Sequence, residues 1–145
     1  MDGMFGKYWD DWFQNKWFDE IKKQTDKNLK TMYKDGDSTI GLMRRKEGED
    51  FEYWIGIFMP ENTDVPKDYE YHDFPKSILG VCWVYGKGTD VFMKEHECAK
   101  KLEEKGYKIV SDNEGAYWFF ERYVPDRFMA NKNGRIILDI CHYIK

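Results

Sequence analysis

Apolar positions recur with a helical period in two stretches of the chain. The first stretch holds six residues at three- and four-residue steps, namely Phe5, Trp9, Trp12, Phe13, Trp17 and Ile21. This spacing puts the side chains on one face of a helix and predicts an amphipathic helix of about five turns. The second stretch, Val91, Phe92, Glu95, Cys98, Ala99 and Leu102, predicts another helix that ends at Gly106.

Shorter runs with a β-type composition predict the strands. They cover residues 38–44, 51–59, 77–85, 116–123 and 135–143. Gly, Pro, Asn and Asp residues separate them, as expected for turns. Residues 45–50 contain Gly48 and predict a hairpin turn between the first two strands, and residues 69–74 predict a short extended piece that Pro75 stops.

The order of these elements predicts the architecture. The second half of the chain runs strand, helix, strand, strand, whereas the first half runs helix, strand, strand, so its opening strand is missing. We predict an α+β fold in which two such halves form a curved antiparallel sheet with two helices on one face. A length of 145 residues fits one domain, residues 1–145. A ligand would bind on the other face or in the cleft between the halves.

Charge and hydropathy exclude several classes of protein. The 23 basic and 27 acidic residues are interspersed and leave a net charge of -4, without the basic stripe that direct nucleic-acid binding requires. No run approaches the roughly 20 apolar residues of a membrane span. The charged start of the chain, with Asp2 and Lys7, lacks the apolar core of a signal peptide. We therefore expect a cytoplasmic protein with no membrane partner.

The potential metal ligands and nucleophiles form no recognisable site. Cys82, Cys98 and Cys141 are odd in number and widely spaced, which predicts reduced, mostly buried thiols in place of a disulfide framework or a zinc site. The three histidines are scattered. The chain also lacks a nucleophile elbow, a P-loop and a dinucleotide fingerprint. We predict neither a metal nor a cofactor.

One carboxylate lies inside an aromatic strand. Glu121 stands within residues 118–123, and strand alternation puts it on the same face as Phe119 and Tyr123. A buried carboxylate without a partner costs several kcal/mol, so a chain that retains one is usually using it. A carboxylate between two rings suits a lipophilic cation. The alternative is an ion pair between Glu121 and a Lys or Arg of a neighbouring strand at a solvated edge.

Further rings and a second acidic residue extend the candidate site. Aromatic residues make up 18% of the chain, which favours an aromatic-lined cavity or interface, with an aromatic-rich core as an equal alternative. The additional ligand-binding candidates on the predicted central strands are Tyr53, Trp54, Trp83 and Tyr85. Which member of each adjacent pair faces the ligand stays open. Asp139, in an apolar strand, could orient Arg122 or a tyrosine hydroxyl, although a structural salt bridge is the favoured alternative.

These segments together resemble the gyrase-inhibitor-like small-molecule-binding domains of the SOUL-like superfamily. The resemblance is carried by residues 53–57, 65–71, 74–75, 118–123 and 137–141, and it spans nearly the whole chain. Such domains are also found as effector-binding domains at the C-termini of AraC-type transcription regulators. The resemblance implies a pocket between the two halves that accepts cationic or aromatic drugs, with Glu121 at its base.

The resemblance also implies an alternative activity. Some stand-alone members are similar to hydrolases that open strained cyclopropane rings of DNA-alkylating natural products. By that analogy Glu121 would orient or deprotonate a water, and Tyr123 or another tyrosine of the pocket would hydrogen-bond the substrate oxygen. We predict a non-catalytic binder of a hydrophobic, cationic or aromatic small molecule. The alternatives are this hydrolase and a protein-interaction module that inhibits a partner enzyme.

Two departures from the family pattern affect these expectations. No helix-turn-helix precedes Met1, so the chain by itself is not expected to be a DNA-binding regulator. The missing opening strand leaves a sheet edge that a second copy could cover, which makes a homodimer a further expectation.

Overall fold

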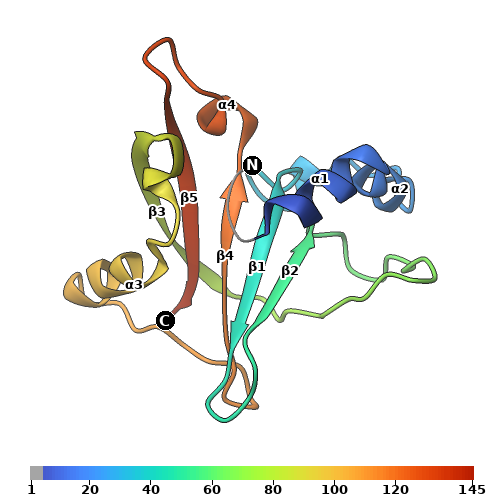
Figure 1. The fold of residues 1–145 in the computed structure, drawn as a ribbon. Helices are drawn as coiled ribbons and strands as arrows, with labels where there is room; N and C mark the ends of the chain where they lie inside the picture. Colours follow the sequence, from blue (N-terminus) through green and yellow to red (C-terminus); the bar gives the residue numbers. More distant parts are fainter. Residues whose placement is uncertain (1–4) are drawn as a thin grey trace.

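The computed structural model of the protein describes residues 5–145, and Asp2 lies outside this range (Figure 1). The elements are α1 (Gly6–Gln14), α2 (Trp17–Lys22), η1 (Leu29–Thr31), β1 (Thr39–Arg45), β2 (Glu52–Gly56), β3 (Ile78–Lys87), η2 (Gly88–Val91), α3 (Glu95–Glu104), β4 (Tyr117–Tyr123), α4 (Pro125–Phe128) and β5 (Arg135–Ile144). The strands form one curved antiparallel sheet in the order β2-β1-β4-β5-β3. The predicted α+β class is confirmed.

The two halves of the sheet meet where β1 pairs with β4. In this register Gly41 lies opposite Glu121 and Met43 lies opposite Phe119. The first half contributes β1 and β2, preceded by α1 and α2, and the second contributes β3, α3, β4 and β5. Among residues 5–145 the first element is α1.

The two faces of the sheet are covered differently. The face that carries α1, α2 and α3 is called the helix face here, and in Figure 1 α1 and α3 stand apart on the viewer's side of it. Trp9 of α1 and Leu102 of α3 join one core cluster on this face with Tyr123. The opposite, loop face is covered by the long connection between β2 and β3, whose Phe58 and Phe74 pack on a second cluster. The helices therefore leave the middle of the helix face between them.

The predicted helix over residues 5–21 is wrong in one respect, because it is broken between α1 and α2. Lys16 adopts a left-handed conformation with a φ of 56°. The break turns Phe18 into the core, where it packs on Trp9 and Trp12 and is 5% exposed. Phe13, which a single straight helix would bury, is 59% exposed. Burial of one more ring on the sheet thus outweighs continuity of the helix.

Other boundaries shift by a few residues, and one predicted element is not formed. The strands lie where the sequence predicts them, although β2 ends at Gly56 and α3 begins at Glu95, after the single turn η2. Residues 69–74 form no strand and belong to the irregular connection over the loop face. The side chains of this connection cover the loop face of the sheet, while its backbone stays outside the sheet.

A disulfide joins Cys82 of β3 to Cys98 of α3. The prediction of reduced thiols is therefore wrong for this pair, and Cys141 is the free, buried cysteine. The two residues are 16 apart in sequence, a spacing that matches no recognised motif. They meet because α3 packs across β3 after the chain turns back.

We expect reduction of this disulfide to lower the free energy of unfolding by about 3 kcal/mol, because it closes a loop of roughly 15 residues in the unfolded chain. Urea unfolding of the protein with and without reductant measures the difference. The double variant Cys82→Ser/Cys98→Ser is the control and should show no response to reductant. An equal response of both proteins would contradict the prediction.

Candidate ligand-binding site

A cleft of about 1550 Å³ opens on the helix face between α1 and α3. Its floor is the sheet, and its walls come from the two helices. Most of its lining is aromatic or apolar, including Phe5, Trp9, Met43, Phe51, Tyr53, Phe92, Phe119 and Tyr123. Small-molecule sites usually occupy about 300–1,000 Å³, so the cleft has room for a drug-sized ligand.

Glu121 lies on the floor of this cleft and is 7% exposed. β4 lies between β1 and β5, and all of its residues after Tyr117 are buried. The Tyr123 hydroxyl donates a hydrogen bond to Glu121 Oε2 at 2.5 Å. Among the ion pairs of residues 5–145, none involves Glu121. Within residues 5–145, Glu121 therefore does not form the solvated ion pair at a sheet edge that was the alternative.

The surroundings of Glu121 favour its neutral, protonated form. Burial raises the pKa of the Glu121 carboxyl to about 8, and the Glu95 carboxyl of α3 adds to the rise, while the hydrogen bond from Tyr123 opposes it. Burial and the neighbouring Glu121 also raise the pKa of Tyr123 above its ordinary value. Groups that share a site and differ from their ordinary pKa in this way are typical of functional sites.

Tyr53 forms a second polar point in the cleft and is held by α1. The Trp9 indole donates a hydrogen bond from Nε1 to Tyr53 Oη at 2.9 Å, and Phe5 stacks on the Tyr53 ring at 3.9 Å. Burial raises the pKa of Tyr53 to about 12. Gly41 makes this arrangement possible, since a Cβ at that position would collide with the Tyr53 hydroxyl. Trp9 also packs edge-on against Tyr123, which links both tyrosines to α1.

Glu95 and His142 belong to the site although neither was predicted as a site residue. Both line the cleft, and His142 Nε2 donates a hydrogen bond to the Glu95 backbone oxygen at 2.9 Å. Burial lowers the pKa of His142, so its ring stays neutral at neutral pH, where it stacks on Phe119. A signal for Glu95 was present in the sequence, because it is the only charged member of the second apolar stripe.

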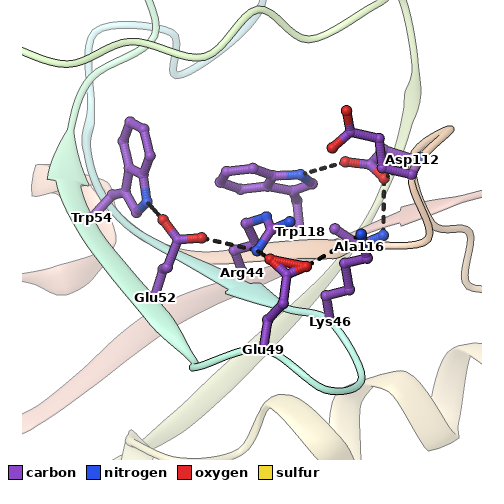
Figure 2. Close-up of polar contacts among 9 residues, drawn as sticks. Arg44, Lys46, Glu49, Glu52, Trp54, Asp112, Ala116 and Trp118 are labelled. Carbon is purple, nitrogen blue, oxygen red and sulfur yellow. Dashed lines mark hydrogen bonds and ion pairs between the residues drawn. The ribbon is translucent and has the colours of Figure 1, made fainter.

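Trp54 lies on the loop face, on the opposite side of β2 from Tyr53. Its Nε1 donates a hydrogen bond to Glu52 Oε1 at 3.2 Å, and Glu52 also accepts one from Arg44 at 2.9 Å. Figure 2 shows this network beside the Trp118 ring, which meets Trp54 edge-on at 5.8 Å. These contacts hold the end of the β1–β2 hairpin against β4.

Trp83 and Tyr85 also lie outside the cleft, on the exposed side of the edge strand β3. Their side chains are 62% and 58% exposed. Arg127 lies over the Trp83 ring at 4.7 Å and Arg135 over the Tyr85 ring at 5.6 Å. Of the seven candidates, the structure therefore brings four together in the cleft, Tyr53, Phe119, Glu121 and Tyr123.

Comparison with protein-family models, with curated proteins and with solved structures found no match to this chain. The structure itself provides two further observations. Within residues 5–145 no group of three or more His, Cys, Asp or Glu side chains could hold a metal ion. No helix of this same range has the length and apolar character needed to span a bilayer. The resemblance to gyrase-inhibitor-like domains stays a prediction.

Proposed function

We propose that the protein binds a hydrophobic, cationic or aromatic small molecule in the cleft between α1 and α3, with Glu121 as its electrostatic anchor. The observation that carries the proposal is a buried carboxyl group that opens onto an aromatic cleft and has no basic partner among residues 5–145. A ligand cation would supply the absent positive charge. The attraction between the two would be strengthened by the exclusion of water from the floor of the cleft.

The rings around Glu121 would supply most of the apolar contact. Phe119 lies on the floor beside Glu121, and Phe5 and Tyr53 form a stacked pair at the α1 wall. A cation over such rings gains about 0.5–2 kcal/mol in addition to the burial of its apolar surface. Hydrogen bonds from Tyr123 to Glu121 and from Trp9 to Tyr53 fix both polar groups before a ligand enters. Preorganisation of this kind reduces the entropy lost on binding.

Hydrolysis of a strained cyclopropanoid substrate is the second candidate function. The contact between Tyr123 and Glu121 and the raised pKa of Glu121 favour it, since general acid–base catalysts need a pKa near the working pH. In the ionised form Glu121 would take a proton from water as the oxygen attacks a ring carbon. Tyr123 would hydrogen-bond the substrate oxygen, and the proton would pass to the carbon released by ring opening.

Titration of the protein with naphthylmethyl-trimethylammonium tests the binding proposal. This permanent cation has a neutral isostere, neopentylnaphthalene, in which carbon replaces the charged nitrogen. We expect the cation to bind at least about tenfold more weakly to Glu121→Gln than to the wild type at about pH 8.5, which corresponds to about 1.4 kcal/mol. Binding of the neutral isostere should be equal in both proteins. Trp9 in the cleft wall provides a fluorescence signal, and calorimetry provides the affinity.

Glu47→Gln is the matched control, because Glu47 is an exposed residue of the β1–β2 turn. It should bind the cation as the wild type does. Equal affinity of Glu121→Gln and wild type for the cation would contradict the proposal. Recovery of a cyclopropanoid compound with one added water, by the wild type and not by Glu121→Gln, would favour the hydrolase. If the protein neither binds the cation nor hydrolyses the cyclopropanoid compound, the protein-interaction module would be the remaining hypothesis.

A further inference from the structure

We propose that the site exchanges a proton for its ligand, so that entry of a cation expels the proton that Glu121 carries beside Glu95. The proposal rests on the proposed function and deepens it, because it states how the same site is regulated. Cation affinity would then rise with pH, and acidification would release the ligand. This pH dependence would arise from the pair of carboxyl groups in the cleft, Glu121 and Glu95.

The geometry places two carboxyl groups from different elements in one cleft. Glu121 comes from the central strand β4, and Glu95 comes from the first turn of α3. The hydrogen bond from His142 to the Glu95 backbone ties this turn to β5, and the Cys82–Cys98 disulfide ties the next turn to β3. The backbone of α3 that carries Glu95 is therefore held against the sheet. Two carboxyl groups can form a hydrogen bond with each other only when one of them carries a proton.

The electrostatics of the pair agree with this geometry. Burial raises the pKa of Glu121 to about 8, and both a hydrogen bond and the charge of Glu95 contribute to the rise. At neutral pH the ligand-free site therefore contains a protonated Glu121. An opposite charge within about 4–6 Å lowers the pKa of a carboxyl group by about 1–3 units. A bound cation would thus bring the pKa of Glu121 to neutral pH or below, and the proton would leave.

The cleft also contains other titratable and charged groups. Those from the sheet are Arg45, Tyr53, Tyr117, Tyr123 and His142. Those from α3 and the residues after it are His96, Lys100, Glu103, Tyr107 and Lys108, while α1 contributes only apolar side chains and Gly6. Burial keeps His142 neutral and keeps the hydroxyls of Tyr53 and Tyr123 protonated near neutral pH. His96 is the remaining imidazole at the cleft, so the test includes a variant without it.

Calorimetric titration in two buffers measures the exchange directly. Naphthylmethyl-trimethylammonium is added at about pH 7 in phosphate and in Tris, which differ in ionisation enthalpy. Because this probe cannot itself gain or lose a proton, the dependence of the observed enthalpy on the buffer gives the protons that the protein releases. We expect the wild type to release between about half a proton and one proton per bound cation. His96→Gln, the control, should release the same number.

Two variants locate the proton. Glu95→Gln should still bind the cation but should release at most about half as many protons as the wild type, because the pKa of Glu121 falls when the Glu95 charge is removed. Glu121→Gln should release none. A carbon-13 titration of the Glu121 carboxyl in the ligand-free protein should show a high pKa in the wild type and a lower one in Glu95→Gln. This measurement needs no ligand, and a pKa of Glu121 that stays above its ordinary value also verifies that Glu95→Gln is folded.

The outcomes separate this proposal from the proposed function. Cation binding to the wild type without proton release would overturn the exchange and leave the binding function intact. If Glu95→Gln released as many protons as the wild type, Glu95 would not be what keeps the proton on Glu121, and the proposal would be overturned. Absence of cation binding to the wild type at both pH 7 and pH 8.5 would overturn the binding function and the exchange together.

Discussion

The ligand-free protein is expected to lose stability as the pH rises from about 6.5 to about 8.5. The pKa of Glu121 is raised from 4.5 to about 8 in the folded protein, so the folded state holds a proton there that the unfolded state releases. A raised pKa of this kind stabilises fully below pH 4.5 and ceases to stabilise as the pH passes through 8. The free energy of unfolding should fall by about 1.4 kcal/mol per pH unit below pH 8, or about 2 kcal/mol across the stated window.

Between about pH 6.5 and 8.5, the other buried groups with shifted pKa values contribute little to the change in stability. Burial lowers the pKa of His142 below 6.5, so this residue affects stability only at lower pH. Burial raises the pKa of Cys141 from 9.0 to about 12, which affects stability only at higher pH. Urea unfolding at several pH values measures the slope. Glu121→Gln should show almost no slope and should be more stable than the wild type at pH 8.5, and parallel slopes in the two proteins would contradict the prediction.

The effect of Glu121 on stability bears on its function. A carboxyl group that reduces stability at neutral and alkaline pH contributes nothing to folding that a glutamine could not supply. If Glu121→Gln is more stable and binds a cation more weakly, then Glu121 serves the ligand and costs stability. Trade-offs of this kind between stability and activity are common at functional sites.

Asp139→Asn is expected to lower the free energy of unfolding by about 3–5 kcal/mol. Asp139 is 0% exposed and accepts hydrogen bonds from the guanidinium groups of Arg122 and Arg127. Arg122 approaches its Oδ2 at 2.8 Å through Nη2, and Arg127 approaches the same oxygen at 2.6 Å. Removal of the charge would leave Arg122 buried without an ionic partner, while Arg127 would keep only Asp35. The structure therefore pairs Asp139 with Arg122 in a salt bridge, the alternative that the sequence favoured.

Chemical unfolding at about pH 7 measures this loss. Asp126→Asn in α4 is the matched control, because Asp126 is exposed and belongs to the same part of the fold. The control should lie within about 0.5 kcal/mol of the wild type, as surface substitutions usually do. Similar stabilities for Asp139→Asn and Asp126→Asn would show that the buried ion pairs contribute little.

Periodicity within each element determined much of the fold and part of the site. Side chains alternate strictly along a strand, so the sequence alone put Phe119, Glu121 and Tyr123 on one face of β4. In the structure these three side chains are buried and line the cleft together. The composition of the strands and their bounding turn residues also placed all five strands.

Tertiary structure decided which faces meet. Tyr53 and Trp54 are adjacent and both aromatic, so only the pairing of β2 with β1 and the packing of α1 place Tyr53 in the cleft and Trp54 on the loop face. Trp83 and Tyr85 lie on an edge strand, a position that follows from the strand order. Alternation determines which residues of a strand share a side, and it carries no information about what covers that side.

The remaining features depend on contacts between residues distant in the sequence. The break at Lys16 is compensated by the burial of Phe18 against rings of α1, and the Cys82–Cys98 disulfide forms because α3 lies across β3. Glu95 is likewise the one charged member of its apolar stripe, and it becomes chemically important because α3 brings it toward Glu121. Local patterns therefore determined the elements and the sides of their residues, whereas long-range packing alone decided the environment that sets the pKa of Glu121.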